Sequence, residues 1–176
     1  TAPADVYETV IKGGKTFQPL DPAVKAITIG NAPTKGSPTA RVNIVEWSDF
    51  ECPYCSRVGD PLKKLVQKYP NDVSVSFKQF PLNFHKSAQK AAEASLAAHA
   101  QGRFWEMHDI MFANQKAIDV PQLELYAGQI GLDVEAFKAD LASNKYAAQV
   151  KQDMGEGNAV GVRGTPSVYI NGRKYQ

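Results

Sequence analysis

The sequence predicts an α/β domain in which a strand–helix–strand unit precedes a block of helices and a C-terminal β-hairpin. Residues 42–47 are rich in β-branched side chains, residues 55–69 place apolar side chains at helical spacing, and residues 73–77 alternate apolar and polar side chains. The connection between the two strands is long enough for a right-handed crossover, so we expect them to be parallel. With 176 residues, 43% of them hydrophobic, the chain suffices for one well-packed domain.

The remaining elements are predicted from glycine, proline and turn signals. Residues 1–40 read as an irregular lead-in, within which residues 24–29 are a possible edge strand. Helical patterns follow the strand–helix–strand unit, and we expect a helical insertion at about 86–143. Near the C-terminus, an apolar run, the dipeptide Asn171-Gly172 and a second short run predict the hairpin.

The only two cysteines lie three positions apart, where the first predicted strand gives way to the helix. Free N–H groups and the positive end of the dipole at a helix N-terminus stabilise an anion, so we expect the Cys52 thiol to ionise readily. Pro53 is expected in the first helical turn, because it has no N–H to lose. Cys55, one turn further on, can reach Cys52 and close a small disulfide loop. The spacing therefore predicts a redox pair.

Two other interpretations of the pair remain open. A four-ligand zinc site needs further cysteines or suitably spaced histidines, whereas His85, His99 and His108 are scattered, so we expect no such metal site. Two thiolates suit Cu(I), which makes copper binding an alternative of a different class. A purely structural disulfide is disfavoured, because so short a loop removes little entropy from the unfolded chain.

Charge and hydropathy limit the classes of partner that the chain is expected to have. The 20 Lys and Arg residues against 18 Asp and Glu residues give a net charge of +2 without a basic run, so nucleic acid is not an expected partner. No apolar stretch approaches 18 residues, so we expect no membrane insertion. The chain starts at Thr1 without an initiator methionine, and we expect that an upstream signal peptide has been removed.

Glu46 is the candidate acid of the site. It shares a pleat face with Val42 and Ile44 and lies six residues before Cys52. An apolar face buries the carboxylate, and desolvation then raises its pKa. We therefore expect Glu46 to relay a proton to or from Cys55.

The aromatic and histidine residues near the pair have weaker signals. Trp47, Phe50 and Tyr54 either surround the pair as an apolar surface for unfolded substrate or belong to the core. His85 and His108 are expected to be structural, since a lone histidine has only its useful pKa to suggest catalysis.

The ordered set of motifs resembles the DsbA-like branch of the thioredoxin superfamily. The set comprises Cys-Pro-Tyr-Cys after a strand, the helical insertion, and Gly-Thr-Pro-Ser at 164–167 before the Asn-Gly hairpin, together with residues 80–85 and 102–108. The resemblance implies a thioredoxin fold with a helical insertion between the βαβ unit and the hairpin, forming a domain over residues 41–176. Such domains normally end in a helix, and this one is expected to lack it.

The resemblance also implies an activity, that of a periplasmic or extracytoplasmic dithiol-disulfide oxidoreductase. Its redox group is the Cys52–Cys55 disulfide, without a further cofactor. Cys52 is the attacking thiol, Cys55 is the resolving thiol, and Pro166 is the cis-proline beside the disulfide. The residues expected to contact substrate are Pro53, Tyr54, Thr165 and Ser167. Ser167 begins a strand whose edge is expected to pair with an extended substrate.

The expected partners are unfolded or partly folded proteins and a redox partner that resets the disulfide. An oxidase is the leading interpretation, because Pro53-Tyr54 differs from the Gly-Pro pair of reducing thioredoxins. The first alternative is a disulfide isomerase or reductase resembling the suppressor-of-copper-sensitivity proteins. Thr165, before the cis-proline, is compatible with that branch.

Overall fold

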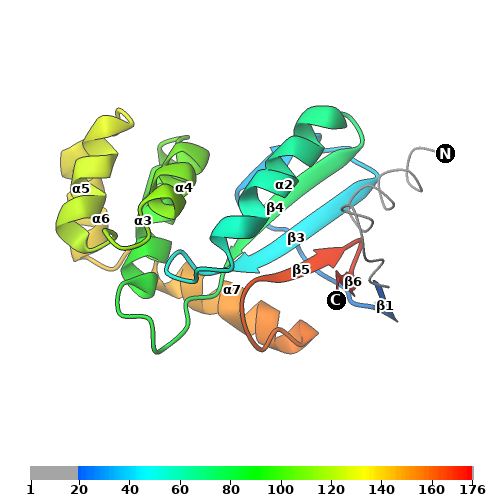
Figure 1. The fold of residues 1–176 in the computed structure, drawn as a ribbon. Coiled ribbons are helices and arrows are strands. Elements are labelled where there is room, and N and C mark those ends of the chain that lie inside the picture. The colour runs from blue at the N-terminus through cyan, green and yellow to red at the C-terminus, as the bar shows by residue number, and fades with distance from the viewer. Residues whose placement is uncertain (1–19, 176) are drawn as a thin grey trace.

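The computed structural model describes residues 20–175, whose strands form one six-stranded mixed sheet in the order β1-β6-β5-β3-β4-β2 (Figure 1). The strands are β1 (Leu20–Val24), β2 (Thr34–Gly36), β3 (Val42–Ser48), β4 (Val73–Gln79), β5 (Ser167–Ile170) and β6 (Arg173–Tyr175). The helices are α2 (Ser56–Lys68), α3 (Ala88–Ala100), α4 (Phe104–Ala113), α5 (Val120–Gln129), α6 (Val134–Ala142) and α7 (Ala147–Val160).

The predicted strand–helix–strand unit is confirmed. Strands β3 and β4 pair in parallel from Val42 opposite Val73 to Ser48 opposite Gln79, and α2 connects them. All seven residues of β4 are buried, as expected for a strand covered on both faces. The two cysteines follow the carboxyl end of β3, which is where open α/β sheets place their sites.

The hairpin is also confirmed, whereas the predicted edge strand is misplaced. Asn171 and Gly172 have φ values of 48° and 76°, the left-handed conformation that a two-residue hairpin turn requires. Residues 24–29 are not a strand beyond Val24; instead β1 and β2 form the two opposite edges of the sheet. The part of the lead-in before residue 20 lies outside the described residues.

A different helix covers each face of the sheet (Figure 1). On one face, α2 buries three apolar side chains against β3 and β4, and these side chains are Leu62, Leu65 and Val66. On the other face, Val45 and Trp47 of β3 pack with Tyr169 of β5 and with partly buried Met154 and Val160 of α7. The alternation along β3 therefore directs Glu46 to the α2 face and its neighbours to the α7 face.

Helix α7 is attached to the sheet by polar groups as well as by packing. The buried Nζ of Lys78 lies 2.6 Å from Glu156 and 3.5 Å from Asp153, both on α7. The indole N–H of Trp47 donates to the Asp153 carbonyl at 2.9 Å. A Cβ on Gly157 would lie only 2.8 Å from the Trp47 Nε1, so glycine permits this close approach.

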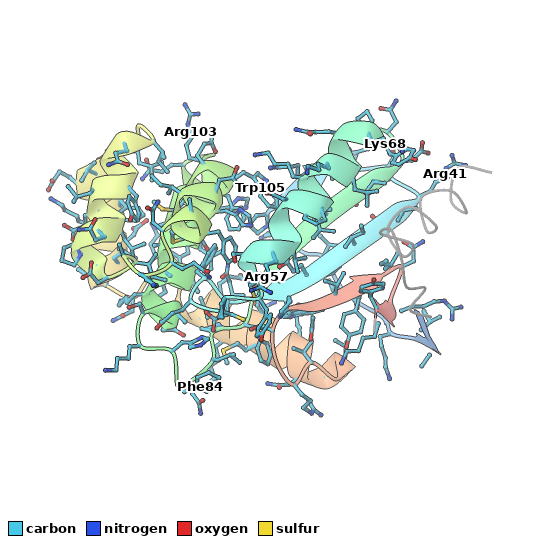
Figure 2. All side chains as sticks on the ribbon, viewed as in Figure 1. Arg41, Arg57, Lys68, Phe84, Arg103 and Trp105 are labelled. Atoms are coloured by element: carbon cyan, nitrogen blue, oxygen red, sulfur yellow. The ribbon has the colours of Figure 1, made fainter. Side chains whose placement is uncertain are left out.

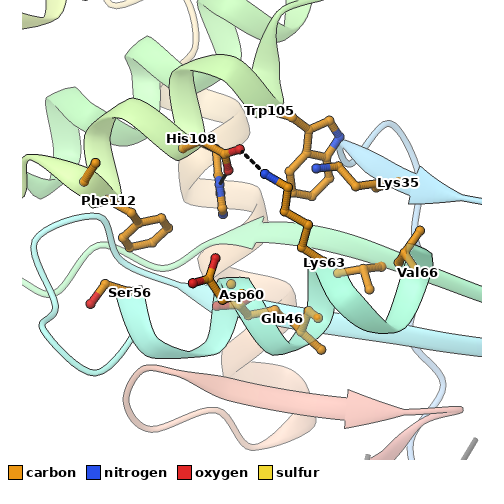
Figure 3. A pocket seen from close by; sticks show the side chains of 14 residues that line it. Lys35, Glu46, Ser56, Asp60, Lys63, Val66, Trp105, His108 and Phe112 are labelled. Atoms are coloured by element: carbon orange, nitrogen blue, oxygen red, sulfur yellow. Dashed lines mark hydrogen bonds and ion pairs between the residues drawn. The ribbon is translucent and has the colours of Figure 1, made fainter. Parts of the chain in front are cut away.

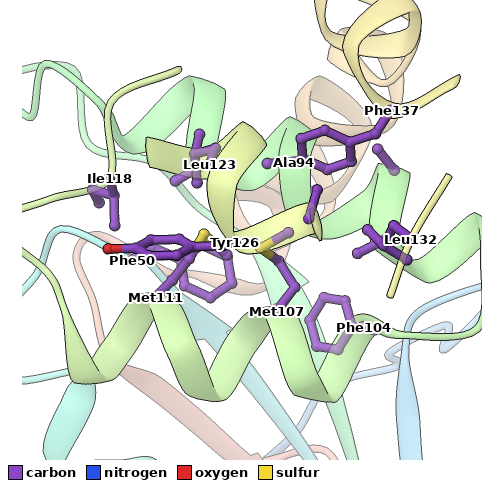
Figure 4. Close-up of a cluster of buried hydrophobic side chains, with 14 of the residues drawn as sticks. Phe50, Ala94, Phe104, Met107, Met111, Ile118, Leu123, Tyr126, Leu132 and Phe137 are labelled. Carbon is purple, nitrogen blue, oxygen red and sulfur yellow. The ribbon is translucent and has the colours of Figure 1, made fainter. Parts of the chain in front are cut away.

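The insertion has a hydrophobic core of its own beside the sheet (Figure 4). Helices α3 to α6 contribute most of this core, and Phe50 and Phe77 from the rest of the domain also belong to it. Asp133 accepts from the Ala136 N–H at 3.0 Å and caps α6. Within residues 20–175, every helix is too short or too polar to traverse a bilayer.

Candidate active site

The cysteine pair lies in the turns that join β3 to α2. The Cys52 N–H donates to the Asp49 carbonyl and the Cys55 N–H to the Cys52 carbonyl, each at 3.1 Å. Helix α2 begins only at Ser56, with Cys55 as its cap residue, so the prediction that Pro53 lies in the first helical turn is wrong. The N–H groups of Arg57 and Val58 donate to the carbonyls three residues back, those of Tyr54 and Cys55, whereas an α-helix that started at Pro53 would direct them to the carbonyls four residues back.

A second loop approaches the pair from the start of β5. The Thr165–Pro166 bond is cis. The Cys52 Sγ lies 3.5 Å from the Thr165 carbonyl, which accepts its hydrogen bond. Thr165 and Pro166 are half-buried. The loop therefore faces Cys52 with a backbone acceptor, and the role beside the disulfide that the resemblance implies for Pro166 stays a prediction.

The edge of β5 at Ser167 is paired on its β3 side, whereas the register of β5 with β6 on the other side runs from Tyr169 opposite Lys174 to Ile170 opposite Arg173. Strand β5 is interior to the sheet, and Ser167 pairs with Trp47 of β3. Its side chain is 7% exposed, and its hydroxyl donates to the Gly164 carbonyl at 2.7 Å. The expected pairing of this edge with an extended substrate stays a prediction.

The two thiols are unbonded and differ in their surroundings. Cys52 is 4% exposed, and it precedes exposed Pro53 and Tyr54, whereas Cys55 is fully buried. Burial raises the pKa of the Cys55 thiol to about 12, an effect that the nearby Ser48 hydroxyl, the Asp49 backbone and the Thr165 hydroxyl only partly oppose. Cys55 therefore holds its proton strongly at neutral pH.

Glu46 is buried, as predicted, and is 2% exposed. Burial raises the pKa of its carboxyl group to about 7, and the Ser48 hydroxyl opposes the rise. Within the described part of the chain, neither the Glu46 Oε1 nor the Ser48 hydroxyl has a hydrogen-bond partner of standard geometry. Ser48 lies close enough to both groups to lower the pKa of each, so the acid and the buried thiol share this neighbour.

Asp49 organises the turn that carries Cys52, and the sequence analysis missed it. Its buried carboxylate accepts from the backbone N–H groups of Glu51 and Leu82 and is hydrogen-bonded to His85 Nδ1, each at 2.8 Å. The His85 ring thus contacts a site residue, although its own role stays a prediction. No local sequence signal reveals Asp49, because two of its partners come from a loop more than 30 positions away.

The three aromatic candidates separate into core and surface. Trp47 and Phe50 are buried, so the interpretation of them as a surface around the pair is wrong. Tyr54 is 63% exposed, with the Arg57 guanidinium 5.3 Å from its ring centroid. Phe84, which the sequence analysis missed, is 71% exposed and stacks edge-on with His85 (Figure 2). Tyr54 thus supplies exposed apolar surface within the Cys-X-X-Cys turn, and Phe84 supplies it on the loop whose His85 contacts Asp49.

No three His, Cys, Asp or Glu side chains of residues 20–175 gather into a metal site. The Cys52 thiol, by contrast, contacts a backbone acceptor, and the Cys55 thiol is near the hydroxyl groups of Ser48 and Thr165. The Ser48 hydroxyl is also near the buried acid Glu46. This arrangement is suited to moving protons to and from sulfur.

The fold and the Cys-X-X-Cys pair are those of the DsbA-like class of thiol-disulfide oxidoreductases. A family model described as thioredoxin matches residues 28–176, and the chain belongs to the thioredoxin family. The structure superposes on oxidised BdbD from Bacillus subtilis with a TM-score of 0.80 at 24% identity, covering 89% of this chain and 90% of that one. A thioredoxin-like oxidoreductase from Silicibacter pomeroyi gives a TM-score of 0.75 at 29% identity, covering 83% of each chain.

The curated relatives are much longer than this chain. A Na(+)/H(+) antiporter, NhaA 3 of Salinispora tropica, is 38% identical over 142 residues. That alignment covers 80% of this chain and 22% of the antiporter. The chain therefore spans about a fifth of the length of that relative.

Proposed function

We propose that this domain introduces disulfides into unfolded or partly folded proteins outside the cytoplasm. The observation that carries the proposal is the asymmetry of the pair: Cys52 lies beside exposed Tyr54 and the Thr165 carbonyl, and Cys55 is fully buried with a raised pKa. This asymmetry supports Cys52 as the sulfur that reacts with a protein substrate. The extracytoplasmic location follows from the proposed product, because protein disulfides persist in oxidising compartments.

The reaction begins from the oxidised pair. A substrate thiolate attacks the Cys52 Sγ, the bond between Cys52 and Cys55 breaks, and Cys55 leaves with the electron pair as a thiolate. A second substrate thiolate then attacks the substrate sulfur of the mixed disulfide, and Cys52 leaves as a thiolate. The substrate has lost two electrons to the pair, and a redox partner bearing a disulfide or another two-electron oxidant removes them.

Glu46 completes the proton balance in this proposal. The Cys55 thiolate is a strong base, because burial raises the pKa of its thiol to about 12. Glu46 has a pKa of about 7 and so carries a proton about half of the time at neutral pH. The acid donates this proton to the departing Cys55 and accepts it again when Cys55 attacks, and the Ser48 hydroxyl is a neighbour of both groups.

Single-cysteine variants test the assigned roles. Cys52→Ser is expected to abolish oxidation of a reduced, unfolded multi-disulfide protein. Given the same protein with its disulfides formed, Cys55→Ser is expected to accumulate mixed disulfides, because its Cys52 thiolate attacks a substrate disulfide, releases one substrate thiolate and has no second thiol to resolve the product. Trapping is measured by gel electrophoresis under non-reducing conditions, with and without reductant. Equal trapping by both variants would contradict the assignment.

The same substrate in scrambled form separates an oxidase from an isomerase. We expect the domain to oxidise the reduced protein readily and to reshuffle the scrambled protein poorly, measured as recovered substrate activity. Equal recovery from both forms would favour the isomerase alternative. Copper content of the reduced protein, determined by elemental analysis, tests the metal-binding alternative.

A further inference from the structure

A cavity of about 330 Å³ lies between α2 and α4, on the face of the sheet that α2 covers (Figure 3). Its outer part is lined by the exposed residues Asp60 and Lys63 of α2 and Asp109 of α4. The Lys63 Nζ and the Asp109 Oδ2 form an ion pair of 2.9 Å, and each of these side chains is 46% exposed. The mouth of the cavity is therefore charged and open to solvent.

The floor of the cavity is buried and carries one acid. Glu46 lines it together with the apolar side chains of Leu62 and Val75. The Oε1 of Glu46 has no hydrogen-bond partner within residues 20–175. A cavity of this size holds several water molecules, at roughly 30 Å³ each, where polar groups are available to bind them. The unpaired carboxyl oxygen thus has a space in which water can reach it.

His108 extends from α4 into the same cavity (Figure 3). Its side chain is buried, and its Nδ1 lies 2.9 Å from the Asp109 Oδ1. The Cε1 atom would lie 3.5 Å from a Cβ on Gly59, so the far edge of the ring approaches α2. No hydrogen bond to another described residue involves Nε2. One ring nitrogen of His108 is therefore bonded to Asp109 at the mouth of the cavity, and the rest of the ring lies within the cavity lining.

We propose that this cavity is the route by which protons reach and leave Glu46, and that His108 passes them between the interior and Asp109 at the mouth. The inference rests on the proposed role of Glu46 as proton donor and acceptor for Cys55. No bond to sulfur changes in this step. A proton taken up at Nε2 is matched by one released from Nδ1 toward Asp109 and solvent.

The charges around the ring favour this exchange. Burial lowers the pKa of His108, Asp109 opposes the change, and Lys35 of β2 and Lys63 of α2 lower the pKa further. His108 is thus neutral at neutral pH, with Nδ1–H donating to the Asp109 carboxylate and Nε2 able to accept a proton. The hydrogen bond to His108 in turn holds the pKa of Asp109 well below its usual range. Asp109 therefore releases any transferred proton quickly to water.

The test measures how fast Cys55 resolves a mixed disulfide between Cys52 and glutathione in weakly buffered solution near pH 7. His108→Phe retains an aromatic ring among Phe50, Phe77 and Phe112 and is expected to slow glutathione release by about tenfold. His99→Phe, at an exposed position on α3, is the matched control and is expected to stay within about twofold of the wild-type rate. An unchanged rate in His108→Phe overturns the proposal.

Chemical rescue distinguishes proton transfer from packing. His108→Ala opens space in the cavity, and added imidazole is expected to restore its rate in a concentration-dependent manner, while His108→Phe gains nothing. A purely structural role predicts no rescue in either variant. If His108→Ala fails to fold, the His108→Phe rate and the double variant described next still decide the question.

Glu46→Gln separates this inference from the proposed function. Slow release in Glu46→Gln, with no further slowing in the Glu46→Gln, His108→Phe double variant, places both groups on one route. If Glu46→Gln releases glutathione slowly and His108→Phe releases it at the wild-type rate, the route through His108 is overturned but the role of Glu46 stands. A wild-type rate of glutathione release in Glu46→Gln overturns both the role of Glu46 and the route. If the double variant slows release by the product of the two single effects, the residues act independently and the shared route is overturned.

Discussion

Each face of the sheet buries a carboxylate, but the two carboxylates differ in their hydrogen-bond and ion-pair partners. On the α7 face, Asp153 accepts from the Gln79 N–H at 3.0 Å and lies 3.5 Å from the Lys78 Nζ. On the α2 face, Glu46 is equally buried, and within the described residues its Oε1 has no partner. A paired buried carboxylate holds two elements together, whereas an unpaired one costs free energy of folding. The comparison separates an acid that maintains the fold from an acid suited to exchanging protons.

The largest expected effect comes from removing the paired acid. Asp153→Ala leaves the Gln79 N–H unpaired and weakens the buried pairing of Lys78, so we expect a loss of about 3 kcal/mol in the free energy of unfolding. Glu156→Ala is the control, because Glu156 is 30% exposed and its loss is expected to cost about 1 kcal/mol. Urea denaturation at pH 7 measures both. Equal losses would show that burial does not distinguish these two carboxylates.

Removing the unpaired acid is expected to have the opposite sign. The folded pKa of Glu46 is raised from 4.5 to about 7, so both folded and unfolded forms are protonated below pH 4.5 and the group has no effect there. As the pH rises, the unfolded chain releases this proton first, and the wild type loses about 3 kcal/mol of stability by pH 8. Glu46→Gln lacks this loss.

The measurement is the free energy of unfolding of Glu46→Gln and wild type at pH 4.5 and pH 8. We expect the variant to be the more stable of the two at pH 8 and the advantage to disappear toward pH 4.5. Comparing the two proteins at each pH cancels the groups that they share. A variant that is less stable at pH 8 would mean that the carboxylate is paired after all.

Substitution of one glycine on each face of the sheet compares the packing of the two faces, with smaller expected changes in stability. A Cβ on Gly157 would lie 2.8 Å from Trp47 on the tightly packed α7 face, and Gly157→Ala is expected to cost about 1–3 kcal/mol. A Cβ on Gly59 would lie 3.5 Å from His108, an ordinary contact, so Gly59→Ala is expected to gain about 0.5–1 kcal/mol through helix propensity. Thermal melts of both variants check the opposite signs.

The central elements of the fold were predictable because their signals are local. The alternation along β4 and the helical spacing of α2 lie within single elements, and the Asn171-Gly172 turn carries its own conformational preference. One edge strand was misplaced and the other was not predicted, because β1 and β2 are short and contain proline or glycine, which are weak strand signals. The late start of α2 depends on turns that involve Asp49 and Cys52, which helical spacing does not reveal.

The cysteine pair and the buried acid were recognisable from the sequence, but the groups that support them were not. The spacing of Cys52 and Cys55 and the face of Glu46 are readable from a few consecutive residues. His108 shares the cavity with Glu46, which lies more than 60 positions earlier in the chain. The sequence indicated a structural role for His108, and its burial agrees, but only the fold shows that the same ring reaches a cavity.

Phe50 connects the active-site turn to the helical insertion. It lies two residues before Cys52, yet its ring belongs to the core of the insertion and packs 4.9 Å from the Phe112 ring. The Gln115 amide, just after α4, donates to the carbonyls of Phe50 and Cys52 at 2.9 and 2.8 Å. The insertion is therefore not a detachable module. Any recombination that exchanges it between related proteins has to carry the cysteine turn with it, or else leave an aromatic ring and two carbonyl groups without their partners.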